Sequence, residues 1–181
     1  TSPPDIGADE FTASLQPMSG SYTIGGTAPD YTTIKKAVDD LHSRGISDAV
    51  TFNIRQGTYN EQNTLYEVPG SSAADTITFR SESGNLQSVN ITYQASSDAE
   101  DFVFKLRGAD HFRFRSVSIS ASGTTYGTAV RMEGNVRDIL FYGNIIGSST
   151  GSCSYVIYSA DGNITSDIVI FGNLISEGGK G

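Results

Sequence analysis

Three short stretches of the chain share one pattern: FRFRSVSI at residues 112–119, ILFYGNII at 139–146 and IVIFGNLI at 168–175. They begin 27 and 29 residues apart, a period typical of solenoids, in which each repeat packs only against its neighbours. In the second and third stretches an alternating apolar run ends at a Gly-Asn pair that marks a corner. The pattern therefore predicts a stack of similar coils.

A further short strand precedes each copy, at 102–106, 129–132 and 155–158, with a glycine-containing turn between. A repeat of two or three short strands and no helix is what one coil of a parallel β-helix requires. A leucine-rich repeat would need a leucine spacing that is missing, and a β-sandwich would not explain corners at near-constant spacing. We therefore predict an all-β fold, a right-handed parallel β-helix (solenoid).

Stacking would align equivalent side chains of successive coils at about 4.8 Å, the spacing between neighbouring strands. Phe114, Phe141 and Ile170 would then form one inward column, and Asn144 would lie over Asn173 at a corner, where the two amides can share hydrogen bonds.

One segment has helical spacing, because Ile34, Ala37, Val38 and Leu41 fall at i, i+3, i+4 and i+7. Asp30, Thr32 and Thr33 offer capping oxygens at its start and Gly45 a left-handed residue at its end, while His42 in the last turn suits the helix dipole. The narrow apolar stripe predicts an N-terminal capping α-helix across the open end of the stack. Other short strands are expected at 22–24, 50–55, 65–68, 77–80 and 89–93.

Composition excludes several classes of partner. A formal charge of −8 disfavours nucleic acid, since that affinity depends on Lys and Arg neutralising phosphates. No stretch approaches the roughly 18 apolar residues of a membrane helix, so membrane insertion is not expected. Cys153 is the single cysteine, which excludes an internal disulfide and a cysteine-based zinc site. No cofactor is expected.

The head of the chain, DYTTIKKAV at 30–38 followed by FNIRQGTYNEQ at 52–62, resembles the capping helix and first coil of pectin methylesterase-like proteins. The chain thus resembles the pectin-lyase-like right-handed β-helix superfamily over about residues 20–181. Within it, the chain looks most similar to β-helix modules of large secreted surface proteins of gliding or biofilm-forming bacteria, often exported by the type IX route. The resemblance implies a secreted protein, extracellular or at the cell surface.

Residues 1–19 show no sustained alternation and contain Pro3, Pro4 and Pro17, so we interpret them as a linker or the tail of a preceding module. In the resembling proteins a segment like PDIGADEF (4–11) closes a module. Residues 20–181 then form the β-helix module, and the apolar coil before Gly178 has no polar capping element, which indicates truncation at the C-terminal end.

The resemblance does not extend to the catalytic pattern. Pectin methylesterases resemble one another in an aspartate pair, an arginine and glutamines on consecutive coils, whereas the coils at 140–144 and 169–173 carry apolar residues with a Gly-Asn corner. Calcium binding by acids, as in pectate lyases, is conceivable at Asp161 with Asp167, or at Asp98, Glu100 and Asp101, but solvated loop acids explain these residues better. His111 follows Asp110 without a marked serine partner, so a turn role is preferred to catalysis.

The outward positions of the repeats offer a candidate ligand-binding face. Alternation turns Arg113, Leu140 and Val169 outward in one column and Arg115, Tyr142 and Phe171 in a second. Flat aromatic rings with arginines on a rigid sheet could dock a sugar ring or a protein surface, whereas the bland alternative is that the rings stack on each other. The candidate binding residues are Arg113, Arg115, Tyr142 and Phe171.

The sequence thus favours a non-catalytic structural or adhesive module of a large secreted surface protein, with glycans as the candidate ligand. Its expected partners are neighbouring modules of the same chain, and a polysaccharide or another surface protein. The alternative is a polysaccharide-active enzyme, a lyase, hydrolase or esterase, with active residues on the β-helix face or beyond this segment. An enzyme should show a cluster of outward charges on adjacent coils, and Lys105 over Arg131 with Arg107 over Glu133 are the charged stacks expected here.

Overall fold

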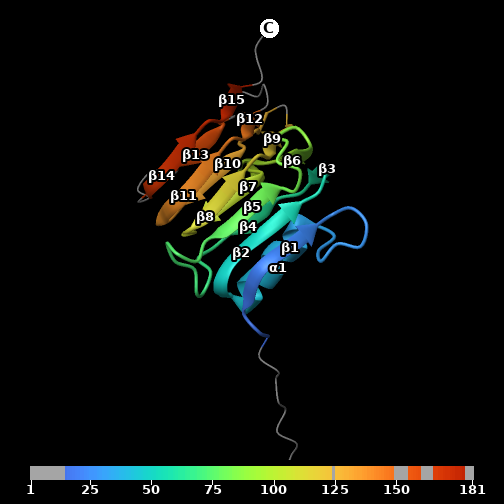
Figure 1. Ribbon diagram of the computed structural model, residues 1–181. Coiled ribbons are helices and arrows are strands. Elements are labelled where there is room, and N and C mark those ends of the chain that lie inside the picture. The colour runs from blue at the N-terminus through green and yellow to red at the C-terminus, as the bar shows by residue number, and fades with distance from the viewer. Residues whose placement is uncertain (1–14, 124, 149–154, 160–164, 178–181) are drawn as a thin grey trace, which may run out of the picture.

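The computed structural model describes residues 15–123, 125–148, 155–159 and 165–177. Within these residues the chain forms fifteen strands, one α-helix and one short 3-10 helix, η1 (Asp98–Glu100). Every strand pairing is parallel, and the strands stack into three sheets that wind around one core (Figure 1). The predicted all-β, right-handed parallel β-helix with an N-terminal capping helix is confirmed.

The three sheets are named here A, B and C. Sheet A runs in the order β1 (Met18–Ile24), β2 (Ile46–Ile54), β5 (Ile77–Ser81), β8 (Phe112–Arg115), β11 (Val136–Tyr142) and β14 (Thr165–Phe171). Sheet B consists of β3 (Gly57–Asn60), β6 (Val89–Tyr93), β9 (Ser118–Ala121), β12 (Ile145–Ser148) and β15 (Leu174–Glu177). Sheet C consists of β4 (Asn63–Leu65), β7 (Phe104–Arg107), β10 (Val130–Glu133) and β13 (Ile157–Ser159).

The predicted repeat alignment is confirmed residue by residue. Phe114 pairs with Phe141, and Phe141 with Ile170, in adjacent layers of sheet A. Phe52 and Phe79 extend the same inward column toward the N-terminus, and the rings of Phe114 and Phe141 stack with centroids 4.9 Å apart. The four phenylalanines are fully buried, so this ladder is a main part of the core.

The corner asparagines also pair as expected. Asn144 Nδ2 donates to Asn173 Oδ1 at 3.0 Å, and Asn144 Oδ1 accepts from the backbone N–H of Val117, which occupies the same corner one coil earlier. The amide of Asn144 therefore satisfies backbone groups that a tight corner between two sheets would otherwise leave buried and unpaired.

Helix α1 (Ile34–Arg44) lies where the sequence places it and covers the first coil (Figure 1). Thr33 caps its N-terminus by accepting from the N–H of Lys36, and the carboxylate of Glu61 accepts from the N–H groups of Ile34 and Lys35. Ile34, Ala37, Val38 and Leu41 are all buried. The side chain of Glu61, between β3 and β4, thus ties the helix to the first coil.

Several strands differ from the expectation. The strand predicted at 65–68 is wrong, because β4 ends at Leu65, and β3 was missed, since Gly57 looked like a turn residue. The first strand contains the expected residues 22–24 but begins earlier, at Met18, and residues 1–14 of the expected linker or tail lie outside the described residues. Within the described residues, no helix is long and apolar enough to cross a membrane.

Candidate functional site

The outer face of sheet A contains the residues that the sequence singled out. Register places Arg113 beside Leu140 and Leu140 beside Val169, and it places Arg115 beside Tyr142 and Tyr142 beside Phe171. The two outward columns are thus arranged as alternation predicts. The register does not test whether Arg113, Arg115, Tyr142 and Phe171 bind a ligand, and that role stays a prediction.

The rings of the second column stack on each other. Tyr142 and Phe171 lie 5.8 Å apart with planes only 8° from parallel, and the guanidinium carbon of Arg115 lies 6.0 Å from the Tyr142 ring centre. Both rings are exposed, Tyr142 to 45% and Phe171 to 65%. Because Tyr142 has Phe171 against one ring face, a ligand on this sheet would meet mainly its edge and its hydroxyl group.

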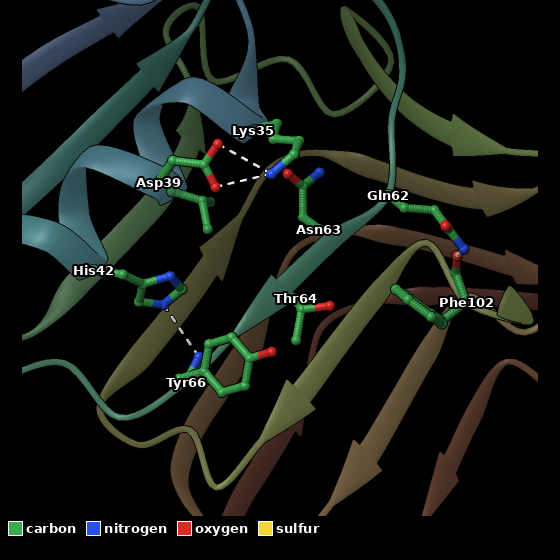
Figure 2. Close-up of a pocket in the computed structure, with 9 residues that line it drawn as sticks. Lys35, Asp39, His42, Gln62, Asn63, Thr64, Tyr66 and Phe102 are labelled. Atoms are coloured by element: carbon green, nitrogen blue, oxygen red, sulfur yellow. Dashed lines mark hydrogen bonds and ion pairs between the residues drawn. The ribbon is translucent and has the colours of Figure 1, made fainter. Parts of the chain in front are cut away.

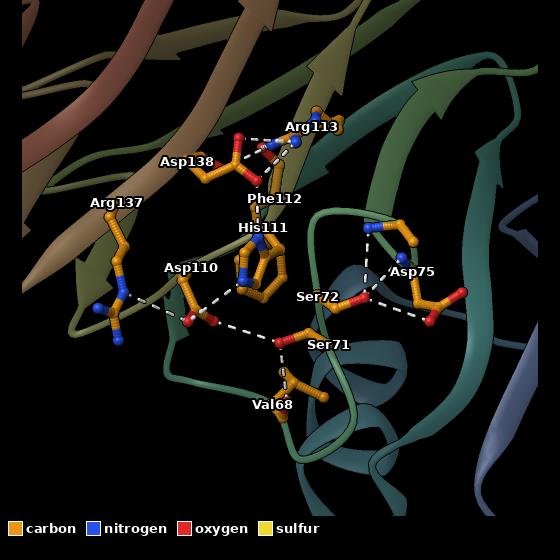
Figure 3. Close-up of polar contacts among 11 residues, drawn as sticks. Val68, Ser71, Ser72, Asp75, Asp110, His111, Phe112, Arg113, Arg137 and Asp138 are labelled. Carbon is orange, nitrogen blue, oxygen red and sulfur yellow. Dashed lines mark hydrogen bonds and ion pairs between the residues drawn. The ribbon is translucent and has the colours of Figure 1, made fainter.

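Arg113 is engaged in an ion pair. Its Nη2 lies 2.8 Å from both carboxylate oxygens of Asp138, and the same carboxylate lies 2.6 Å from Nδ1 of His111 (Figure 3). Burial alone would raise the pKa of Asp138, but the hydrogen bonds from Arg113 and His111 outweigh that effect and lower it. The side chain of Arg113 is only 14% exposed, so its main partner is Asp138.

His111 belongs to a turn at the start of β8, as expected. Its backbone has φ +60°, and Asp138 and Asp167 have left-handed φ angles of +49° and +56° at the same point of the next two coils. Asp110 lies on the other side of the ring, and the hydroxyl of Ser71 donates to Asp110 and not to His111 (Figure 3). The cluster therefore lacks the serine–histidine contact of a nucleophilic triad.

The outer face of sheet C presents a third column, which sequence reasoning did not propose as a site. Register aligns Thr64, Lys105, Arg131 and Tyr158 on four successive strands. At the strand spacing of about 4.8 Å this row spans roughly 14 Å. The sequence offers a signal for the last three of these residues, because the aligned stretches 102–106, 129–132 and 155–158 contain them at equivalent positions. Only the Lys105–Arg131 pair was recognised from the sequence.

Charges on sheet C form a compact network. Glu133 lies 2.9 Å from Nε of Arg131 and 3.7 Å from Nζ of Lys105, so one carboxylate lies between two cations. Each cation also faces an aromatic ring: Lys105 lies 4.2 Å from the ring centre of Phe102, and Arg131 lies 5.7 Å from that of Tyr158. The expected register of Lys105 over Arg131 and Arg107 over Glu133 is confirmed.

A hollow of about 200 Å³ lies at the C-terminal end of this row. Tyr155 and Tyr158 form one wall, with ring centres 5.0 Å apart, and Tyr155 is 52% exposed. Asp101 also lines this hollow; it is buried and accepts from the backbone N–H and the hydroxyl of Thr128. The interpretation of Asp101 as a solvated loop acid is therefore wrong, because its carboxylate pins one coil to the next.

A larger cavity, of about 330 Å³, lies at the N-terminal end between α1 and β4 (Figure 2). The expectation that His42 interacts as a cation with the helix dipole is wrong, because its Nε2 accepts a hydrogen bond from the backbone N–H of Tyr66 at 3.1 Å. Burial lowers the pKa of His42, so the ring is held neutral. The lining residues are Lys35, Val38, Asp39, His42, Gln62, Asn63, Thr64, Tyr66 and Phe102.

In the described part of the chain, no group of three or more His, Cys, Asp or Glu side chains is placed to hold a metal ion, and Asp98, Glu100 and Asp101 belong to that part. Asp161 lies outside the described residues, and Asp101 is occupied by Thr128. The described side chains of sheet C offer hydrogen-bonding groups, aromatic rings and paired charges.

Comparison with known proteins gives similarity at the level of structure. No family model matches the sequence, and no curated protein sequence matches it. The pectin methylesterase of Aspergillus niger in deglycosylated form superposes with a TM-score of 0.56 at 17% identity, over 90% of this chain and 58% of that structure. The same esterase in penultimately deglycosylated form, which retains an N-acetylglucosamine stub, gives 0.53 at 16% identity, with the same coverage.

This similarity establishes the fold, a parallel β-helix of the pectin methylesterase type. The chain spans 58% of the length of those esterase structures.

Proposed function

We propose that the chain is a non-catalytic, polysaccharide-binding β-helix module of a secreted cell-surface protein, and that the polysaccharide lies across the strands of sheet C. The observation that supports this most directly is the straight outward row from Thr64 to Tyr158 with a hollow at each end. A linear polysaccharide needs such an open, elongated surface, because the sugar units on either side of the bound stretch must continue into solvent at both ends.

The side chains of the row suit a sugar ligand. Aromatic rings offer apolar faces for sugar rings, and the ion-paired groups offer donors and acceptors already fixed in place. Lys105 and Arg131 are partly covered by Phe102 and Tyr158, so little side-chain entropy remains to be lost on binding. The fold similarity to pectin methylesterases, whose name refers to a polysaccharide, supports the same ligand class.

One observation favours the second candidate, a polysaccharide-active enzyme. Lys105, Arg131 and Glu133 form a charged cluster on adjacent coils, as an enzyme should show. Glycoside hydrolysis, however, typically uses two carboxyl groups that both face the substrate, whereas Glu133 is paired with two cations and Asp101 accepts two hydrogen bonds from Thr128. We therefore rank binding above catalysis.

The test is a glycan array with soluble pectins, polyuronates and neutral polysaccharides, followed by calorimetric titration of each hit. Tyr158→Ala should weaken binding about tenfold, since it removes an aromatic wall and the partner of Arg131. Tyr142→Ala, on the outer face of sheet A, is the matched control and should leave the affinity unchanged. A parent protein that binds no polysaccharide would refute the proposal.

The same samples distinguish the alternatives. If Tyr142→Ala and Phe171→Ala abolish binding while Tyr158→Ala does not, the ligand lies on sheet A, where the sequence first placed it. Release of methanol, unsaturated products or new reducing ends would show an enzyme instead.

A further inference from the structure

Asn63 is a buried side chain without a hydrogen-bond partner, and it lines the cavity between α1 and β4. It is 2% exposed, and neither its Oδ1 nor its Nδ2 has a partner among the described residues. Each unpaired buried polar group lowers the stability of the folded state, because its bonds to water are lost and not replaced. Buried polar groups are nearly always paired in native proteins, so an orphaned carboxamide requires an explanation.

Packing alone does not explain an asparagine at this position. Register places Asn63 in the inward column of sheet C, beside Phe104, with Val130 and Ile157 in the following coils. An apolar side chain would continue that column at lower cost. Figure 2 shows the carboxamide of Asn63 rising from β4 on the side of helix α1. Asn63 therefore lies at the boundary between the inward column and the cavity that it lines.

The cavity offers both polar and apolar contacts. A carboxamide donates and accepts at neighbouring atoms, which complements two adjacent hydroxyl groups. The ring of Tyr66, 45% exposed, packs edge-on against His42 with ring centres 5.3 Å apart, and Phe102 lines the same space. About 330 Å³ lies at the small end of the 300–1,000 Å³ typical of ligand sites.

The lining carries no net charge. Lys35 and Asp39 neutralise each other, with Nζ 2.9 Å from Oδ1 and 3.0 Å from Oδ2. His42 accepts a hydrogen bond from the N–H of Tyr66, and its burial keeps it neutral. A charged ligand would enter this partly buried space without a free counter-ion, which costs free energy. The chemistry therefore favours an uncharged ligand.

We infer that this cavity binds one uncharged sugar unit, with adjacent hydroxyl groups paired to the carboxamide of Asn63 and the sugar ring against Tyr66. The cavity adjoins the N-terminal end of the row on the outer face of sheet C, since Thr64 belongs to both, but one sugar unit can occupy it without a polymer along the row. A sugar unit would supply the hydrogen-bond partners that Asn63 lacks, and Tyr66 would supply a flat apolar contact.

The test is a titration of the 181-residue chain with D-galactose, D-glucose and N-acetyl-D-glucosamine, followed through the side-chain amide signals of Asn63 in ¹H–¹⁵N NMR spectra. At least one of these sugars should shift the signals saturably, with a dissociation constant of roughly millimolar size. Asn63→Leu, which has a similar shape, should weaken binding at least about tenfold and raise the melting temperature, since it removes the orphaned amide.

Tyr66→Ala is the second variant, because its exposed side chain can be removed without disturbing the core, and it should also weaken binding. Tyr158→Ala, which should weaken polymer binding, should leave the sugar-induced shifts of the Asn63 signals unchanged, because Tyr158 does not line the cavity. Failure of this site is therefore distinguishable from failure of the polymer site. The inference is overturned if none of the three sugars shifts the Asn63 signals, or if Asn63→Leu and Tyr66→Ala bind as the parent does. Tighter binding of D-galacturonate than of the neutral sugars would overturn it as well.

Discussion

Asn144 is the residue on which the corner between β11 and β12 depends. Its Oδ1 accepts from the N–H of Val117, and its Nδ2 donates to the carbonyl of Phe114 and to Asn173. Asn144→Ala leaves two buried backbone groups unpaired, so we expect the free energy of unfolding to fall by about 3 kcal/mol. Urea denaturation followed by circular dichroism measures this change.

Asn173→Ala is the matched control one coil later. The side chain of Asn173 is only partly buried, so water can replace some of its bonds and the loss should be smaller. Equal losses for the two variants would show that the corner is held by something other than the buried amide of Asn144.

The two arginines on sheet A should behave differently when truncated. Arg113→Ala removes both hydrogen bonds to the Asp138 carboxylate and leaves that partly buried group with His111 alone, so we expect a loss of about 1–2 kcal/mol in unfolding free energy. Arg115 is exposed, and Arg115→Ala should cost less than about 0.5 kcal/mol. Thermal and urea unfolding of both variants provide the comparison, and equal losses would contradict the network seen at Asp138.

At the scale of residues, the sequence predicts to which side of a sheet a side chain points but not which side chain it contacts. Alternation correctly turned Arg113 and Tyr142 outward, because side chains of a strand point to opposite faces. It did not reveal that Asp138 pairs with Arg113, since that contact depends on a left-handed residue at the coil start with φ +49°. Non-glycine residues rarely adopt this conformation, so no sequence pattern marks it.

Helix α1 is joined to the first coil through His42, which should make its docking sensitive to acid. Burial lowers the pKa of His42 from its usual 6.5, against a weaker opposing effect of Asp39 and with a further lowering by Lys35. The folded state therefore binds this proton less readily than the unfolded chain. The contribution of His42 is complete above pH 6.5 and is lost as the pH falls toward the lowered value.

Melting temperatures between about pH 8 and pH 5 test this prediction. The parent should lose stability on acidification over this range. In His42→Gln the side-chain oxygen can still accept from the N–H of Tyr66 but does not titrate, so the slope should be smaller. Identical slopes for both proteins would mean that His42 does not couple the helix to pH.

Two glycines at positive φ separate backbone strain from steric clash. Gly143, at the end of β11, has φ +64° and open space around an added Cβ, so Gly143→Ala should cost about 1–2 kcal/mol from backbone strain alone. Gly70, between β4 and β5, has φ +90°, and an added Cβ would lie 2.0 Å from the backbone oxygen of Ile46. Gly70→Ala should therefore cost several kcal/mol more, as measured by urea denaturation.

The order of these losses is the discriminating result. A Gly70→Ala variant as stable as Gly143→Ala would show that the turn can move away from Ile46.

At the scale of elements, a helix or strand could be predicted where its apolar residues repeat often enough to show a regular spacing. The helix was predicted correctly because its four apolar residues follow a 3.6-residue spacing and Thr33 caps it. Strand β6 matched the expected 89–93, whereas β3 and β4 are only four and three residues long and follow each other almost directly. Such short strands show too few alternations to be recognised, and their existence depends on pairing with β6 and β7.

For the whole molecule, the stacking of coils could be predicted from the sequence. Of the site on sheet C, the outward row could be predicted and the hollows at its ends could not. The repeat fixed which side chains share a column, including Lys105, Arg131 and Tyr158. The hollows at both ends depend on helix α1 and on the turn before β7, where Phe102 lies against Lys105 and Asp101 binds Thr128 of the next coil. A repeat alignment contains no information about such turns.

Stability should decline along the solenoid of this 181-residue chain. The N-terminal strand β1 is covered by α1 and has Met18 and Ile24 fully buried, whereas Ile170 and Phe171 of β14 are exposed and β14 pairs only with β11 among the described strands. Neighbouring coils stabilise each other, so a layer with one described neighbour should open most readily. We expect amide hydrogens of β14 to exchange about a hundredfold faster than those of β5. This factor corresponds to a difference of about 2.7 kcal/mol in the free energy of local opening. Hydrogen exchange by NMR measures the gradient, and uniform protection from β1 to β14 would mean that the coils open together as one unit.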